Sequence, residues 1–103
     1  MAKEMSVHKI GATLDASTSN REQEALVALM DKGKDVAIDL SGCDYVSSAG
    51  LRVLLYSYKL ARSKGLQLYL IGVHEEVREV MRMTGFEKFF AYYDTVEDCT
   101  LCS

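Results

Sequence analysis

Proline is absent from this sequence of 103 residues, and no apolar run approaches the roughly 18 residues that a membrane span requires. The seven glycines are scattered singly, so they form neither a linker nor a low-complexity stretch. These absences predict a single domain over residues 1–103 that does not insert into a membrane.

Positive charge is also scarce. Twelve lysines and arginines face fifteen aspartates and glutamates, which gives a net charge of -3 and a pI near 5.3. Such a chain has no basic surface for phosphate backbones, so we expect no nucleic-acid partner. The first residues, 1–6, contain a charge pair without an apolar run behind it, which predicts a cytoplasmic protein.

Cysteine and histidine do not form a recognisable metal or redox pattern. The three cysteines, Cys43, Cys99 and Cys102, are an odd number without a secretion signal, which indicates reduced thiols. Cys99 and Cys102 have the spacing of a redox or zinc pair, but they lie outside a βαβ helix start, and structural zinc needs two further ligands. His8 and His74 have no neighbouring ligand pattern. We therefore expect no metal and no cofactor.

The common enzyme motifs are missing as well. The sequence has no P-loop, no dinucleotide fingerprint, no nucleophile elbow and no His-Glu-x-x-His pair. This favours a binding module over an enzyme.

Hydrophobic residues are plentiful at 49%, enough for a core without metals or disulfides. Residues 7–14 are predicted to form a strand that ends at Asp15. Apolar residues at helical spacing predict a helix within residues 17–32, which Gly33 stops. Candidates for its N-cap are Ser17, Ser19 and Asn20.

The middle of the sequence predicts a βαβ unit. A nearly continuous apolar run at residues 36–40 is typical of a buried strand, and a polar turn follows at residues 41–44. A helix then begins at Ser47 or Ser48, and a strand at residues 66–71 closes a right-handed parallel crossover. The remaining predicted elements are a helix from Glu75 to Gly85, a strand over residues 89–93 and a short helix over residues 95–102.

Two serine hydroxyls stand where the loop becomes this central helix. The first turn of a helix has unpaired N–H groups and a partial positive charge, so a phosphate on Ser47 or Ser48 would be stabilised there. It would also bring nearly two negative charges close to Asp44, and to Asp39 and Asp15 if the strand ends pack together. A surface that docks a partner when neutral could then repel it. The simpler alternative is that one serine only caps the helix.

The same segment resembles a known family. Asp39-Leu40-Ser41, followed by the run from Tyr45 to Leu55, resembles the signature of STAS domains, the family of anti-sigma factor antagonists. The resemblance continues in other segments, so that it covers the chain from about Gly11 to about Asp94. These segments are residues 11–15, 64–70 and 77–86.

The resemblance implies a fold and a function. The fold is an α/β STAS domain with a small mixed β-sheet flanked by about four helices. Members bind a serine-kinase anti-sigma factor of the GHKL type and so release the sigma factor. Phosphorylation of a switch serine ends that binding, and a metal-dependent serine phosphatase resets it. The motif places the switch serine at Ser48. Members often have aspartate immediately before the switch serine, whereas this chain has Ser47, whose hydroxyl is the second-choice acceptor.

Several residues are candidates for partner binding. Arg52, Tyr56 and Lys59 lie opposite the apolar face of the predicted helix, where they could form a docking ridge or simply a solvated face. Asp15 and Asp44 could orient the loop, although loop aspartates usually cap their own turns. The full set expected to bind the partner is Asp15, Asp44, Tyr45, Ser47, Ala49, Gly50, Arg52 and Tyr56.

Two alternative functions stay open at this point. The chain could be a STAS docking or ligand-sensing module of a transporter or lipid-trafficking system, without phosphorylation. It could also be a small thiol enzyme built on Cys99 and Cys102. The short segment before Gly11 further implies that the N-terminal strand pair of the family is trimmed. One sheet edge would then be open to a partner or to a second copy, so we expect a monomer or a weak dimer.

Overall fold

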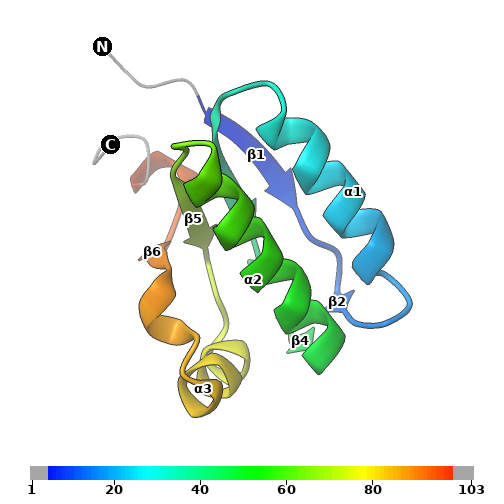
Figure 1. The fold of residues 1–103 in the computed structure, drawn as a ribbon. Helices are drawn as coiled ribbons and strands as arrows, with labels where there is room; N and C mark the ends of the chain where they lie inside the picture. The colour runs from blue at the N-terminus through cyan, green and yellow to red at the C-terminus, as the bar shows by residue number, and fades with distance from the viewer. Residues whose placement is uncertain (1–4, 99–103) are drawn as a thin grey trace.

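The computed structural model describes residues 5–98, which fold into two small parallel sheets and their covering helices (Figure 1). The larger sheet has the order β1-β3-β5-β6, and β2 pairs with β4 in a separate two-stranded sheet. The strands are β1 (Met5–Lys9), β2 (Thr13–Leu14), β3 (Asp35–Asp39), β4 (Tyr45–Val46), β5 (Leu68–Ile71) and β6 (Ala91–Tyr93). The helices are α1 (Ser19–Met30), α2 (Ser48–Ser63), α3 (Glu75–Thr84) and the 3₁₀ helix η1 (Glu87–Phe89).

The α/β fold class is confirmed, and so is the central βαβ unit of β3, α2 and β5. Every strand pair within residues 5–98 is parallel, so the mixed pairing that we expected is not seen in this part of the chain. The reason lies in the connections. Helix α1 separates β1 from β3, α2 separates β3 from β5, and α3 separates β5 from β6. A crossover of this kind returns the chain in the same direction.

The prediction of one strand over residues 7–14 was wrong, because the chain changes sheets at Gly11. The Ile10 backbone N–H donates to the Asp39 carbonyl at 3.0 Å, which extends the pairing of β1 with β3. Two residues later, the Ala12 carbonyl accepts from the Asp44 N–H at 3.1 Å and so begins the β2–β4 pairing. The hydrophobic pattern continues through the bend, so the pattern does not reveal it.

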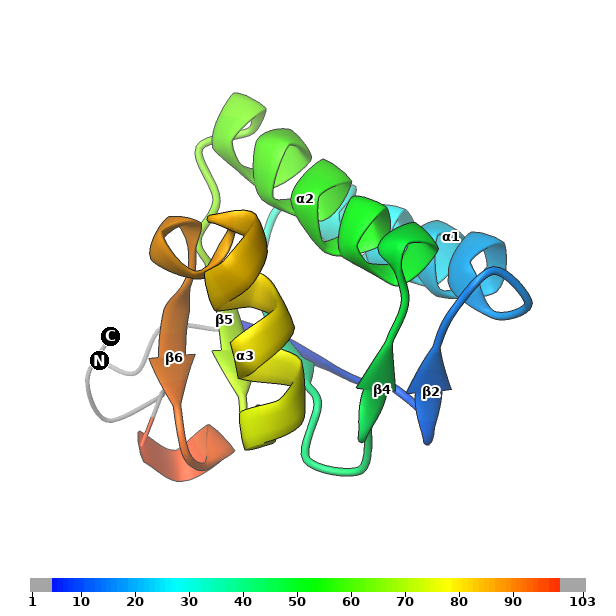
Figure 2. The same cartoon turned by 90° about the horizontal axis from the view of Figure 1, so that it is seen from below.

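The core lies mainly between the larger sheet and helices α1 and α2, which run side by side over one face (Figures 1 and 2). Side chains alternate along a strand, so β3 and β5 supply both faces of the sheet. Val36, Ile38, Leu68 and Leu70 join the main core with α1 and α2. Ala37, Tyr69 and Ile71 form a second cluster on the opposite face, with partly buried Tyr93 and Val96.

The predicted helix boundaries agree with the structure more closely than the predicted N-cap residues of α1 do. Thr18, and none of the three capping candidates, occupies the N-cap of α1, and no side-chain cap bond forms there. Instead, the Asp15 carbonyl accepts from the backbone N–H groups of Thr18 and Ser19 at 3.1 and 2.8 Å. At the other end of the fold, α3 stops at Gly85, whose φ of 80° is the left-handed conformation that glycine adopts easily.

The C-terminal part differs slightly from the prediction. Phe89 belongs to η1, so the strand predicted for residues 89–93 is shortened to β6. Residues 96–98 are helical, and the Thr95 hydroxyl accepts from the Asp98 N–H at 3.1 Å. Cys99 and Cys102 lie outside the described residues. Among residues 5–98, no helix is long and apolar enough to cross a membrane, and no three metal-ligating side chains gather at one point.

Candidate functional site

The small β2–β4 sheet positions the start of α2 (Figure 2). Thr13 pairs with Tyr45 and Leu14 with Val46. The Leu14 carbonyl then accepts from the Ser47 backbone N–H at 3.0 Å, immediately before the helix begins. The junction between β4 and α2 is therefore held by backbone bonds to a segment more than thirty residues earlier.

Gly50 lets the first turn of α2 approach β2 closely. A Cβ atom added at this position would lie 2.2 Å from the Leu14 carbonyl oxygen and 2.9 Å from the side chains of Leu14 and Val46. Only the hydrogen of glycine fits at such distances. We expected Gly50 to bind the partner, but it is buried in its own chain and has a packing role. Leu14 was not among our candidates, although a glycine inside a helix pattern hints that some backbone comes near.

The two adjacent serines have different environments. Ser47 is the N-cap of α2, and its Oγ accepts a hydrogen bond from the Gly50 N–H at 3.3 Å. Ser48 is the first helical residue, its side chain is exposed, and its hydroxyl has no hydrogen-bond partner within residues 5–98. Capping thus falls to Ser47, and Ser48 presents a free hydroxyl to solvent.

The first turn of α2 also has free backbone donors. The Gly50 N–H donates to the Ser47 Oγ, and the Leu51 N–H donates to the Ser47 carbonyl at 2.9 Å. The N–H groups of Ser48 and Ala49 have no acceptor in the described part of the chain. No acidic residue occupies this turn, so no carboxylate competes for the positive end of the helix. An anionic group attached at Ser48 would therefore meet a favourable field.

Exposed side chains continue from Ser48 along one side of α2. Ser48, Arg52, Tyr56 and Lys59 are all exposed and follow helical spacing, as we predicted for the last three. Tyr56 is 46% exposed, which is unusual for a large aromatic side chain. Arg52 makes no ion pair within residues 5–98. We call Ser48, Arg52, Tyr56 and Lys59 the exposed stripe.

Before the helix, Asp44 and Tyr45 extend the exposed surface. Tyr45 is 54% exposed even though it belongs to β4. Cys43, two residues before Tyr45, is buried. The Cys43 thiol donates to the Tyr45 carbonyl at 3.3 Å. Burial raises the pKa of the Cys43 thiol, so this cysteine stays protonated and supports the loop without being reactive. Ala49 is only half-buried and lies between the stripe and the core.

Asp15 lies beside the site because it follows Leu14, the residue bonded to Ser47. One of its carboxylate oxygens accepts from the Ser17 hydroxyl at 2.6 Å and from the Ser17 N–H at 2.9 Å. The bond from the Ser17 hydroxyl is the main reason that the pKa of Asp15 is lowered. Asp15 therefore caps its own turn and adds a fixed negative charge near Ser47.

Asp39 supports the loop that precedes β4. Burial raises the pKa of its carboxyl, but hydrogen bonds from Ser41 and the charge of Lys9 outweigh this effect, and the pKa is lowered overall. The Asp39 carboxylate accepts from the Ser41 N–H at 2.9 Å, and the His74 ring nitrogen lies 2.6 Å from the Ser41 carbonyl oxygen. The loop is thus tied to the end of β3 and to the start of α3.

Comparison with known proteins gives a consistent picture. Residues 3–99 match the family model of the STAS domain. A Bordetella bronchiseptica protein named "Putative anti-sigma factor antagonist BtrV" is 41% identical over 81 residues, which are 78% of this chain and 69% of that protein. The anti-sigma-B factor antagonist of Staphylococcus epidermidis is 30% identical over 80 residues, which are 77% of this chain and 74% of that protein.

Solved structures share the fold at lower identity. An anti-sigma factor antagonist from Mycobacterium paratuberculosis has a TM-score of 0.83 at 22% identity and covers 99% of this chain and 90% of its own. A sulfate transporter family protein from Wolinella succinogenes also has a TM-score of 0.83, at 14% identity, with coverage of 95% and 83%. Identities this low show the shared fold alone.

Proposed function

Because this chain belongs to the STAS domain family, we propose that it is an anti-sigma factor antagonist that works by partner switching. In this proposal the unphosphorylated chain binds a serine-kinase anti-sigma factor of the GHKL type in the cytoplasm. Phosphorylation of Ser48 ends the complex, and a metal-dependent serine phosphatase restores it. The observation that carries the choice of residue is the exposed, unpartnered hydroxyl of Ser48 beside the engaged hydroxyl of Ser47.

A kinase must reach the hydroxyl that it phosphorylates. Ser48 meets that condition because its side chain is exposed. Ser47 is half-buried, and its Oγ already accepts a hydrogen bond from the Gly50 N–H. A kinase that modified Ser47 would first have to break this capping hydrogen bond to free the hydroxyl. Ser48 can be modified without loss of any hydrogen bond within residues 5–98.

The exposed stripe supplies a partner surface around the same residue. Tyr and Arg are enriched among the residues that dominate binding energy, and Arg52 and Tyr56 stand one and two turns beyond Ser48. Asp44 and Tyr45 complete this surface at the preceding loop. We propose these residues, with the half-buried Ser47 and Ala49 at the edge, as the contact surface for the anti-sigma factor.

A phosphate would oppose docking by two effects. It adds about two negative charges at the centre of this surface. It must also lose part of its hydration when the partner approaches. Unpaired charge of this kind typically costs an interface about 2–5 kcal/mol, so we expect the affinity to fall at least about thirtyfold.

The deciding experiment is phosphorylation by a GHKL-type serine-kinase anti-sigma factor, with ATP and with the acceptor located by mass spectrometry. We expect stoichiometric phosphate on Ser48. The Ser48→Ala variant should accept none, while the matched Ser47→Ala variant should still be labelled. Binding of the kinase to each form is then measured by calorimetry, and only the phosphorylated chain should lose affinity.

Labelling of Ser48→Ala at Ser47 would move the switch by one residue. No labelling of any form, together with full cellular function of Ser48→Ala, would overturn the proposal and favour a docking module without phosphorylation. The fold alone is compatible with that second function, since a transporter family protein shares it.

A further inference from the structure

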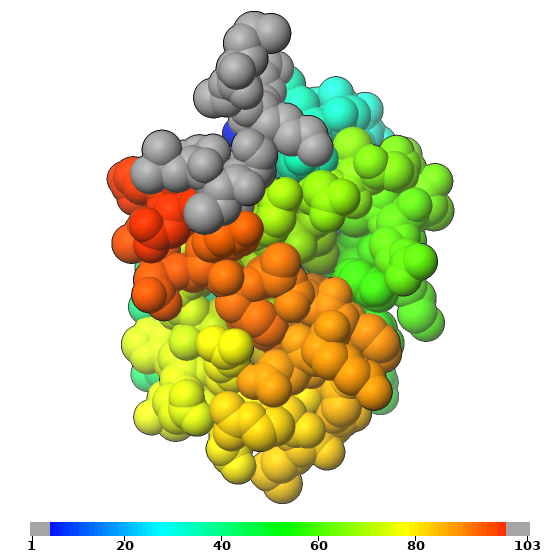
Figure 3. Space-filling model, turned by 90° about the vertical axis from the view of Figure 1, so that its left-hand side faces the viewer, coloured from blue at the N-terminus to red at the C-terminus, as the bar shows by residue number. Residues whose placement is uncertain are grey.

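A cavity of about 390 Å³ lies well apart from the exposed stripe, on the face formed by α3, β6 and the segment that follows β6. Figure 3 shows this face, with α3 in yellow, η1 and β6 in orange and the last described residues in red. The cavity opens at the carboxyl ends of β5 and β6, where Ile71 pairs with Tyr93. Parallel sheets commonly bind small ligands at this edge. Its walls are Val73, Arg78, Tyr92, Tyr93, Asp94 and Asp98.

Arg78 is held in place before any ligand arrives. Its Nε donates to a Glu87 carboxylate oxygen at 3.0 Å, and its guanidinium lies over the Tyr92 ring, 4.1 Å from the ring centroid. The Tyr92 hydroxyl in turn donates to the Glu87 carbonyl at 2.7 Å, which fixes the ring. The terminal nitrogens Nη1 and Nη2 of Arg78 have no acceptor within residues 5–98. A preorganised guanidinium with two free amino groups is suited to a carboxylate.

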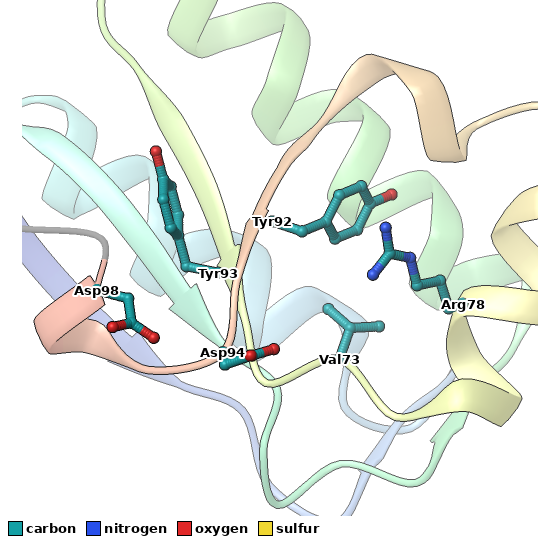
Figure 4. A pocket seen from close by; sticks show the side chains of 6 residues that line it. All are labelled: Val73, Arg78, Tyr92, Tyr93, Asp94 and Asp98. Carbon is teal, nitrogen blue, oxygen red and sulfur yellow. The ribbon is translucent and has the colours of Figure 1, made fainter. Parts of the chain in front are cut away.

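The other end of the cavity is acidic. In Figure 4, Val73 and Asp94 lie between Arg78 on one side and Asp98 on the other. Neither Asp94 nor Asp98 has a cationic partner in the described part of the chain. Val73 supplies an apolar wall between the two charged ends. With one arginine and two aspartates, the lining has a formal charge of -1.

We propose that this cavity binds a free amino-acid-like molecule that carries one carboxylate and at least one ammonium group. The carboxylate binds Nη1 and Nη2 of Arg78, and the ammonium lies between Asp94 and Asp98. A short aliphatic chain packs on Val73. A net positive ligand balances the lining, so a basic amino acid fits better than a neutral one. The proposal is independent of Ser48 and its phosphorylation.

The test uses L-lysine as the probe and the full chain labelled with ¹⁵N. Titration should give saturable shifts of the amides at Val73, Arg78, Asp94 and Asp98, and smaller shifts elsewhere. Cadaverine, which lacks the carboxylate, and glutarate, which lacks the ammonium groups, should each bind about tenfold more weakly or not at all, since each loses a charge-assisted pair.

Variants separate this site from general charge effects. Arg78→Gln and Asp94→Asn should each weaken lysine binding about tenfold or more. Their controls are Arg21→Gln and Glu24→Gln, both at exposed positions of α1, which should bind lysine like the unchanged chain. Spectra of all four variants without ligand report whether each is folded.

Three titration results would overturn the proposal. They are an absence of saturable lysine shifts, saturable shifts centred on another part of the molecule, and equal binding of lysine and cadaverine. Unchanged affinity in a folded Arg78→Gln variant would be equally decisive. None of these results bears on the phosphorylation of Ser48, so failure here leaves the proposed function intact.

Discussion

At the start of α2, the adjacent serines Ser47 and Ser48 have separate physical roles. Ser47 satisfies a backbone donor that the helix cannot satisfy itself, and Ser48 points its hydroxyl into solvent. Capping therefore supports the helix at one position, and the neighbouring position is available for chemistry. Arg52 adds a positive charge one turn along the same exposed stripe.

Replacement of Ser47 by alanine should lower the free energy of unfolding by about 1 kcal/mol, because the cap to Gly50 is lost. For a chain of this length the midpoint of thermal unfolding falls by about 4–8 °C. Circular dichroism melting measures the change. The control is Ser48→Ala, which should stay within about 0.5 kcal/mol of the unchanged chain. Equal destabilisation by both variants would contradict the separate roles.

Reversal of charge at Arg52 should weaken the anti-sigma factor complex. If phosphate at Ser48 repels the partner, the partner surface disfavours negative charge there, and an exposed arginine one turn away is favourable. We expect Arg52→Glu to raise Kd about tenfold or more, measured by calorimetry with the kinase. Lys32→Glu carries the same charge change on an exposed turn outside the stripe. Comparable losses in both variants would show that net charge, and not position, decides.

At the scale of elements, the junction of β4 with α2 depends on a contact with β2. Gly50 brings the helix against the Leu14 carbonyl, and the bond from Ser47 to the same carbonyl holds the strand pair in register. The exposed serine is therefore placed by buried backbone. A second support is the loop before β4, which Asp39 ties to the end of β3 and His74 to the start of α3.

Gly50→Ala should destabilise the chain by about 1–3 kcal/mol, because its Cβ would meet the Leu14 carbonyl oxygen at 2.2 Å and the backbone must shift. Urea unfolding measures the loss. Gly11→Ala is the control, since a Cβ there meets nothing within 4 Å. It should change stability by less than about 1 kcal/mol. A fully stable Gly50→Ala variant would mean that the junction is looser than the structure shows.

The lowered pKa of Asp39 makes the same junction sensitive to acid. The folded chain holds this carboxylate charged more readily than the unfolded chain does, so its contribution is complete above the ordinary pKa of 3.8 and is lost as the pH falls through the lowered value. Asp39→Asn should therefore flatten the fall in stability below about pH 4. Urea unfolding across this range, with Glu24→Gln as the control, checks it. An unchanged pH profile in Asp39→Asn would count against this role.

For the molecule as a whole, the switch acts on a surface that is already built. The free N–H groups of Ser48 and Ala49 are in place, and both sheets hold the surrounding loop. A phosphate thus changes the charge of one face without any need for the fold to move. The cavity beside Arg78 lies on another face and stays available in both states.

Phosphorylation of Ser48 should therefore leave the backbone nearly unchanged. In ¹H–¹⁵N spectra we expect large shifts only for residues 44–52 and their neighbours in β2. The Ser48→Ala variant treated with the same kinase provides the reference. Large changes throughout β5, β6 and α3 would instead indicate a conformational switch.

The sequence by itself determined the α/β class, the central βαβ unit and the position of two hydroxyls at a helix start, because these depend on local periodicity and on short motifs. Only the tertiary structure decided which serine caps the helix, and that Gly50 packs against Leu14. It also decided that residues 7–14 divide between two sheets, and it revealed the cavity around Arg78. The physical reason is the same in each case: these features arise from contacts between segments far apart in the chain, and local pattern carries no record of such contacts.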